Sequence, residues 1–138
     1  MWDRTVGGAQ PGQFYHPSGL ALTPDDAFLL VAETQNQHVL VLRATDGVWV
    51  RRLTGPQFTL HFPNGVAVVP STGQVLVSDL GRHRVIQFQS IEDDSVVGTL
   101  GTVRGSGPTQ FQNPFGLAVL DGPCCLSVRL SFHVVAKQ

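Results

Sequence analysis

The sequence predicts an all-β protein, about half of a six-bladed β-propeller built from four-stranded antiparallel blades. Three observations lead to this fold class. A short pattern occurs three times along the 138 residues, its copies are spaced like propeller blades, and the chain is rich in turn formers, with 15 Gly and 9 Pro. Frequent Gly and Pro supply the many turns that short strands need.

The repeated pattern has the form φ-x-x-Pro-x-Gly-φ-Ala-φ, where φ is an apolar residue. Its copies are residues 14–22, 60–68 and 111–119, and their prolines are 46 and 51 residues apart. Propeller blades repeat every ~40–50 residues, whereas common helical-pair repeats are about 34 residues long. At the 46-residue period a closed ring of six blades takes 276 residues, twice the 138 of this chain.

The pattern makes the whole chain, residues 1–138, one repeat region. The repeats span about 14–59, 60–110 and 111–138, and residues 1–13 are expected to end a preceding blade. This last expectation rests on a second match, because residues 5–14 and 102–111 share T-V-x-G-x-x-P-x-Q-F. The later stretch follows a predicted strand and leads into the next copy, so the chain begins in the middle of the pattern.

Within a copy, short runs of Val, Leu and Phe alternate with turn residues, as in 24–26 and 70–73. In the second copy the strands are expected at about 65–69, 74–79, 84–89 and 95–100. Residues 75–77 are apolar on both faces, which suits an inner strand between neighbouring blades. Residues 49–53 mix polar and apolar side chains and suit an outer edge.

A second block repeats in step with the first, because residues 30–40 align with 76–86 at the same offset of 46. Together the two blocks resemble NHL-repeat β-propellers, whose repeats carry Pro-x-Gly-φ-Ala and then Asp-x-x-Asn-His-Arg-Val. The best match is residues 79–85, in which Arg82 replaces the Asn. The resemblance covers residues 5 to about 120.

The resemblance implies that the acid and the base of this block form a structural pair. A tight strand connection would let the Asp79 carboxylate meet the Arg84 guanidinium. Glu33 and His38 would be a weaker, pH-dependent version of the same pair.

The third copy departs from the family pattern, because Leu130 stands where an acid is usual. Two apolar stretches, 125–130 and 132–136, are still expected to form strands.

Composition limits the classes of partner. Nine basic and ten acidic residues give a net charge of −1, so no overall field draws the chain to nucleic acid or anionic lipid. No apolar run is long enough for a membrane span, and the start lacks the layout of a secretion signal, which favours a cytoplasmic location. The adjacent Cys124 and Cys125 are expected to be reduced thiols, not a disulfide or a metal knuckle.

Catalytic chemistry finds little support in the sequence. His16 and His61 are out of register with each other around their repeat prolines, so no ring of equivalent metal ligands is spelled out. The G-x-S-x-G and H-E-x-x-H motifs are absent. We therefore expect no catalytic residues, no metal and no cofactor. A metal-dependent lyase-like propeller enzyme, as known in some relatives, stays as an alternative.

The function that the resemblance favours is protein binding, with substrate recruitment in a ubiquitin-ligase-like protein as a more specific form. The candidate binding residues are Arg52, Arg82, His83 and Arg104, since guanidinium groups suit protein interfaces. They also suit RNA, which some family members bind. Half a ring leaves open edges, so the chain is either a fragment of a longer protein or half of a homodimer that completes the ring.

Overall fold

Strands account for nearly all of the regular structure. The computed structural model describes residues 14–54, 60–101, 104, 110–112, 114, 116–121, 126–130 and 134–137. Within these residues the strands are β1 (Pro17–Leu22), β2 (Phe28–Glu33), β3 (His38–Arg43), β4 (Trp49–Leu53), β5 (Pro63–Val68), β6 (Val75–Asp79), β7 (Arg84–Phe88), β8 (Val96–Leu100), β9 (Leu117–Asp121), β10 (Leu126–Leu130) and β11 (Val134–Lys137). One short 3-10 helix, η1 (Leu80–Arg82), joins β6 to β7.

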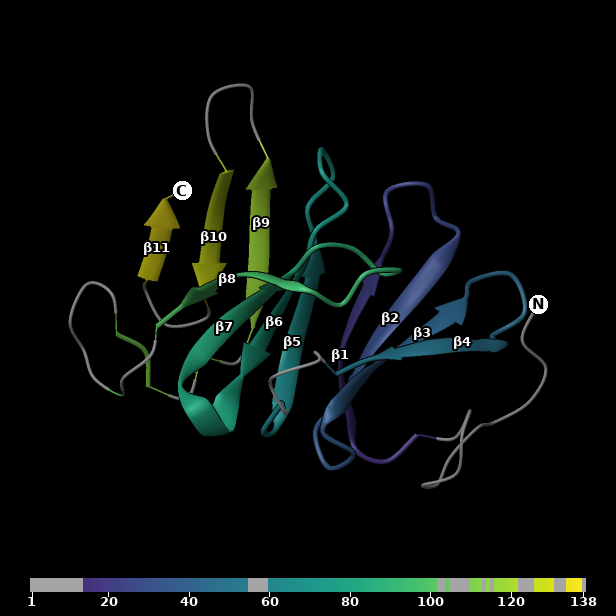
Figure 1. Cartoon of the computed structure of the whole chain (residues 1–138), viewed down its shortest axis with the longest axis horizontal. Coiled ribbons are helices and arrows are strands. Elements are labelled where there is room, and N and C mark those ends of the chain that lie inside the picture. The colour runs from purple at the N-terminus through teal and green to yellow at the C-terminus, as the bar shows by residue number, and fades with distance from the viewer. Residues whose placement is uncertain are drawn as a thin grey trace.

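The strands form three antiparallel sheets, which stand side by side in Figure 1. The first sheet has the order β1-β2-β3-β4 and the second β5-β6-β7-β8, and we call them blade 1 and blade 2. The third sheet has the order β11-β10-β9 in the described part of the chain. The predicted fold class is thereby confirmed: the chain is a partial propeller of four-stranded antiparallel blades.

The first strands of the three sheets are neighbours, with β5 between β1 and β9. The repeat glycine allows this approach in blade 1, because a Cβ on Gly19 would lie 2.2 Å from the carbonyl oxygen of Asn64. The Ser18 hydroxyl donates to the same carbonyl at 3.1 Å, and the Thr34 hydroxyl donates to the carbonyl of Pro63 at 3.0 Å. The Pro-x-Gly element of the pattern therefore fastens one blade to the next.

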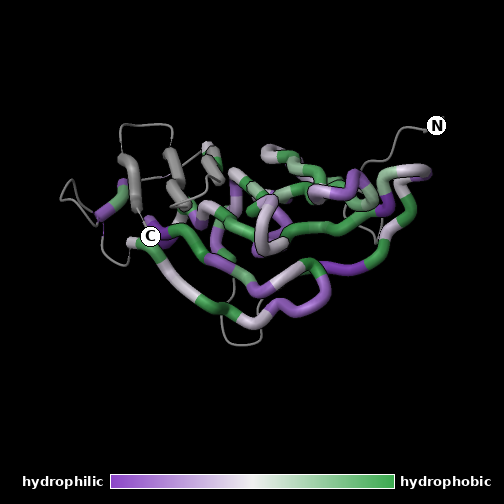
Figure 2. Tube along the Cα trace, turned by 90° about the horizontal axis from the view of Figure 1, so that it is seen from above, coloured by the Kyte–Doolittle hydropathy of each residue, from purple (hydrophilic) through white to green (hydrophobic). Residues whose placement is uncertain are grey.

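The hydrophobic core lies between the sheets. Figure 2 shows hydrophobic and hydrophilic segments alternating along the described part of the chain. The cluster between blades 1 and 2 consists of Leu30, Ala32, Val39, Val41, Leu53, Leu60, Val66, Val75, Val77, Ile86 and Phe88. A second cluster, of Val69, Leu76, Val85 and Phe111, joins blade 2 to the third sheet.

The run at 75–77 has the two-faced packing that its sequence predicted. Val75, Leu76 and Val77 are all 0% exposed. Successive side chains of a strand point to opposite faces, so Val75 and Val77 pack towards blade 1 while Leu76 packs towards the third sheet. The mixed segment 49–53 forms β4, the last strand of its sheet.

The strands expected in the second copy are all present. β5 begins two residues earlier than expected, at Pro63, because Pro63 pairs with Asp79 beyond an irregularity in the register. The two tail strands also form, as Leu126–Leu130 and Val134–Lys137. The expectations for residues 1–13 and for Cys124 and Cys125 lie outside the described residues.

Candidate functional site: the loops at one end of the blades

The first feature of the site is a buried ion pair in blade 2. Asp79 closes β6 and Arg84 opens β7, and the two residues pair across the sheet. The Asp79 side chain is fully buried, and its Oδ2 lies 2.8 Å from both Nε and Nη2 of Arg84. Its other oxygen, Oδ1, accepts the backbone N–H of His61 at 2.7 Å. One carboxylate thus ties the β6–β7 connection to the loop that enters β5, and we call the pair the blade 2 clamp.

The connection inside this clamp is η1 followed by a left-handed residue. His83 has φ 55° and ψ 42°, and its N–H donates to the carbonyl of Leu80 at 3.2 Å. The N–H of Gly81 donates to the carbonyl of His61 at 2.7 Å. A Cβ on Gly81 would lie 2.2 Å from Nδ1 of His61, so only glycine lets the His61 ring pack against η1.

Blade 1 repeats this arrangement 46 residues earlier with a different base. Glu33 closes β2, His38 opens β3, and Glu33 is 0% exposed. Its Oε1 accepts the N–H of Tyr15 at 2.8 Å, and its Oε2 lies 2.5 Å from Nε2 of His38. Gln37, just before His38, is left-handed with φ 60°, as His83 is in blade 2. Glu33 and His38 form the blade 1 clamp.

The two clamps differ in charge. Burial lowers the pKa of His38 below its ordinary value of 6.5; Glu33 opposes this shift, and the charge of Arg52 adds to it. The ring is therefore neutral at neutral pH and donates its Nε2–H to the carboxylate. The blade 1 clamp is a hydrogen bond to a neutral ring, whereas the blade 2 clamp is an ion pair with a permanently charged guanidinium.

The clamps hold two unusual loops in place. His16 and Phe62, the residues before the repeat prolines, have φ values of 52° and 62°. Bulky residues rarely adopt this conformation, so it persists only where surrounding bonds determine it. The Tyr15 and His16 rings meet edge to face at 4.9 Å, and the His61 and Phe62 rings are tilted at 4.6 Å.

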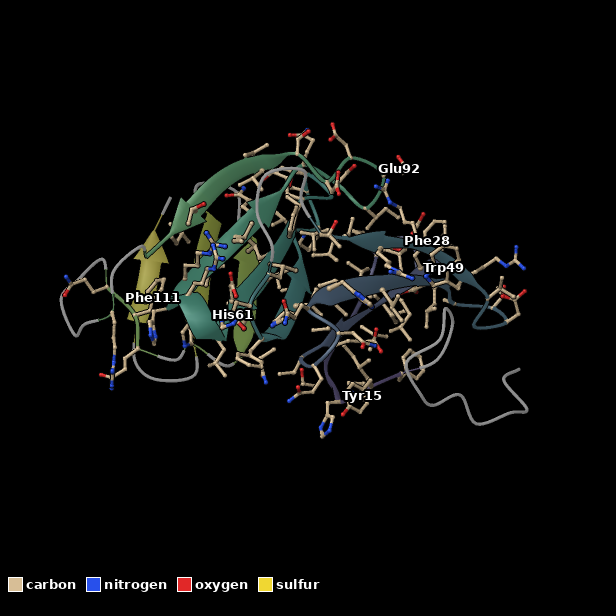
Figure 3. All side chains as sticks on the ribbon, turned by 60° about the horizontal axis from the view of Figure 1, so that its bottom comes forward. Tyr15, Phe28, Trp49, His61, Glu92 and Phe111 are labelled. Atoms are coloured by element: carbon tan, nitrogen blue, oxygen red, sulfur yellow. The ribbon has the colours of Figure 1, made fainter. Side chains whose placement is uncertain are left out.

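These loops and connections lie together at one end of the blades. We call it the clamp end; it comprises residues 14–16, 34–37, 60–62 and 80–83 and is the lower end in Figure 1. The opposite turn end carries the turns 23–27, 44–48, 69–74 and 89–95. Figure 3 shows Tyr15, His61 and Phe111 along one side of the molecule and Glu92 on the opposite side.

The structure places two of the four candidate binding residues at the clamp end and the other two next to it. Arg82 and His83 lie in the η1 connection, with Arg82 exposed and His83 half-buried. Arg52 is exposed and precedes Leu53, which pairs with Val39 at the start of β3.

Arg104 reaches the same region from farther along the chain. It is exposed and forms an isolated bridge with Phe111. A Cβ on Gly101 would touch both the Phe111 ring and the carbonyl of His83, so this bridge lies beside η1. Three arginines distant in sequence therefore lie in or next to one end of the blades.

Acidic residues are distributed in the opposite way. In the described loops of the turn end, the acids are Asp25, Asp26, Asp46, Glu92, Asp93 and Asp94. At the clamp end the described acids are Glu33 and Asp79, and both are buried in the clamps. The clamp end therefore presents arginines, aromatic rings and amides to solvent, with no exposed carboxylate among its described residues.

Within the described residues no group of three or more His, Cys, Asp or Glu side chains is placed to hold a metal ion. The helical structure described is too short and too polar for a membrane-crossing segment.

The family model of the NHL repeat matches residues 60–88, which include the blade 2 clamp and the His61 loop. The chain contains an NHL repeat. No curated protein sequence is a significant match.

Solved structures agree with the fold. Kuenenia stuttgartiensis hydrazine synthase matches with a TM-score of 0.62 and 14% identity, over 98% of this chain and 37% of that chain. The structure of U3-55K matches with a TM-score of 0.63 and 19% identity, over 96% of this chain and 39% of that one. This chain thus spans about two-fifths of these neighbours' length, and at such low identity the likeness concerns the fold alone.

Sequence reasoning missed the backbone half of each clamp. The amides of Tyr15 and His61 occupy the same place, two residues before their repeat prolines, and each donates to a buried acid 18 residues ahead. In the sequence, the two histidines near these prolines, His16 and His61, are one position out of register with each other. Aligning the residues at −2 from each proline would have paired Tyr15 with His61, although nothing in either side chain marks the role.

Proposed function

We propose that this NHL-repeat chain is a protein-binding module whose clamp end recruits a partner, as part of a ubiquitin-ligase-like assembly in the cytoplasm. The observation that carries the proposal is the distribution of exposed carboxylates. Within the described loops they lie at the turn end, where Asp46 pairs with Arg43, while Arg52, Arg82 and Arg104 are exposed in or next to the clamp end. NHL propellers commonly mediate protein interactions, which supports the same reading.

The clamp end has the composition of an interface. Arginine and tyrosine are enriched where proteins bind one another, because they offer large contact areas with fixed donors. Tyr15 is 47% exposed on the same end as the arginines. Because the clamps fix these loops before any partner arrives, less conformational entropy is lost on binding.

The partner chemistry that fits this end is an acidic protein segment. Guanidinium groups bind carboxylates through paired hydrogen bonds. At the clamp end the described carboxylates are already engaged with His38 and Arg84 and with two backbone amides. Among the described residues, no other carboxylate at the clamp end competes for the exposed arginines.

The test uses the purified 138-residue chain and a fluorescent peptide rich in Asp and Glu. We expect Arg82→Glu and Arg104→Glu each to weaken binding by about tenfold or more, because each reverses a charge that faces the peptide. The matched control is Arg43→Glu, which reverses an arginine paired with Asp46 at the turn end. An equal loss in all three variants would refute binding at the clamp end.

RNA is the second candidate, favoured by the same arginines, because guanidinium groups also contact phosphates. Single-stranded RNA is therefore measured beside the acidic peptide over a range of salt concentrations. Tighter binding of RNA, with a steep fall in affinity as salt rises and loss in Arg82→Glu, would replace the protein partner by RNA.

The ubiquitin-ligase role needs a cellular readout. In cells that make the full protein, the recruited partner is expected to carry ubiquitin, and Arg82→Glu is expected to lower that modification while Arg43→Glu leaves it unchanged. Equal ubiquitin modification of the partner with the wild type and with both variants would mean that recruitment at the clamp end does not lead to ubiquitin transfer.

A further inference from the structure

One face of blade 1 exposes large apolar side chains. Leu20 and Leu22 of β1 are 65% and 50% exposed. They pair across the sheet with Val31 and Leu29 of β2, and directly opposed residues lie on the same side of a sheet. We call this side of blade 1 the open face.

The repeat shows what this face does in blade 2. The positions 46 residues after Leu20 and Leu22 are Val66 and Val68. Val66 is only 6% exposed and belongs to the cluster between blades 1 and 2, and Val68 packs against that cluster. Blade 1 covers them with its other face, which includes Leu30. The open face of blade 1 therefore corresponds to the face of blade 2 that packs against the preceding blade.

A second feature of the repeat points the same way. The first apolar residue of each copy seals the boundary between two sheets. Leu60 is 0% exposed between blades 1 and 2, and Phe111 is 4% exposed between blade 2 and the third sheet. Phe14 takes the same place on the open face, against Val31 and Leu40, but is only half-buried. The open face therefore carries the residue that closes a boundary between two sheets, although no described sheet packs against this face.

We propose that the open face docks a blade of a second copy of this chain, so that two copies close into one ring. The contact between blades 1 and 2 supplies the template, because there the equivalent face of blade 2 packs against a blade of the same repeat. Blade 1 and the third sheet stand at opposite ends of the row of sheets in Figure 1, as a closing ring requires.

The open face also has the make-up of a contact site. Trp49, 40% exposed, pairs with Leu42 on β3, which contributes to the floor of this face. Contiguous exposed apolar surface of this kind marks an interaction site in soluble proteins, and buried tryptophan anchors rank among the strongest contributors to binding. A second copy would cover Leu20, Leu22 and Trp49 together. Arg52, which pairs with Leu40, lies on the same side of the sheet.

The test is the mass of the 138-residue chain in solution, measured by sedimentation over a range of concentrations. The inference predicts a particle of twice 14.9 kDa. Leu20→Glu and Leu22→Glu place charges in the contact and are expected to weaken the dimer by about a hundredfold or more. Both side chains are largely exposed in the single copy, so the fold should persist. Val97→Glu is the matched control, since Val97 is 46% exposed on β8 of blade 2.

A wild-type chain that stays monomeric at every concentration would overturn the inference, as would a dimer that Val97→Glu weakens as much as Leu20→Glu. Hydrogen exchange of the wild-type chain tests the same surface without any substitution. On dilution below the dissociation constant, protection should fall in β1 and remain in β7. Loss of protection in both strands alike, or in neither, would also contradict docking at the open face.

Discussion

The clamps of blade 1 and blade 2 have the same geometry but different chemistry. Glu33 is one methylene longer than Asp79, and the His38 side chain is shorter than that of Arg84, so the combined reach across the sheet is kept. In both clamps one carboxylate oxygen accepts a backbone amide of the loop ahead of the first strand, at 2.8 Å in blade 1 and 2.7 Å in blade 2. The constant part is the acid and the amide, while the base can vary.

The comparison shows which part of the motif shapes the clamp end. The left-handed residues Gln37 and His83 occur in both connections although one precedes His and the other Arg. The loop conformation therefore depends on the buried acceptor more than on the charge of the base. The base changes how much the clamp contributes to the free energy of unfolding. Four measurements can distinguish the two clamps in this respect.

The largest effect is expected from Asp79→Asn. The amide can still accept the His61 N–H, but the Arg84 guanidinium, with only 10% of its side chain exposed, loses its counter-charge. Removing one partner of such a buried pair costs about 3 kcal/mol of unfolding free energy. Urea denaturation measures it.

The control for this variant is Asp46→Asn, in an exposed pair with Arg43 whose side chains are 41% and 52% exposed. Solvent screens an exposed pair, so Asp46→Asn should destabilise the protein much less than Asp79→Asn does. If both variants lowered the free energy of unfolding by the same small amount, Asp79 would not be compensating a buried charge.

A smaller effect is expected from the equivalent change in blade 1, Glu33→Gln. Because the His38 ring is neutral, no buried cation is left without a partner, and the cost is that of one altered hydrogen bond, about 1 kcal/mol. The same urea titration applies. A loss as large as that of Asp79→Asn would mean that His38 is charged in the folded protein at neutral pH.

The smallest effect is a pH dependence that belongs to blade 1. Since folding lowers the pKa of His38, the unfolded chain binds the proton more readily than the folded one. The stability from this group is present above the ordinary pKa of 6.5 and is lost as the pH falls below it, by at most about 1.4 kcal/mol per pH unit.

His38→Arg tests this assignment, because arginine stays charged throughout the range. The variant is expected to flatten the slope of unfolding free energy between about pH 7 and pH 5. Asp25, Asp46 and Asp93 do not interfere, because hydrogen bonds from Thr23, Arg43 and Ser95 hold the pKa of each carboxyl below 3.8. An unchanged slope would assign the pH dependence to another group.

Much of the fold could be predicted from local sequence. The strands of blade 2 follow from apolar runs between turn residues. The run at 75–77, which is apolar on both faces, predicted a strand that is buried on both faces. The pairing of Asp79 with Arg84 was available only through the resemblance to NHL repeats. Periodicity was enough to predict the sheets, because the order of apolar and polar residues within a strand shows which of its faces are buried.

The site was harder to predict, because its bonds join residues far apart in the chain. Nothing local to Tyr15 or His61 indicates that its amide meets an acid in another strand. The left-handed conformations of His16 and Phe62 also run against the preferences of residues before proline. The shared position of Arg82 and Arg104 emerged only once the Arg104 bridge was placed beside η1.

The most direct test of the two-clamp account is amide hydrogen exchange at Tyr15 and His61, followed between about pH 7 and pH 5 and corrected for the intrinsic exchange rate. Both amides donate to buried carboxylates, so both should be protected at neutral pH. On acidification, protection of the Tyr15 amide should fall because opening lets His38 take up a proton, while protection of the His61 amide should not change. Equal losses at both amides, or an unprotected amide at either position, would contradict the account.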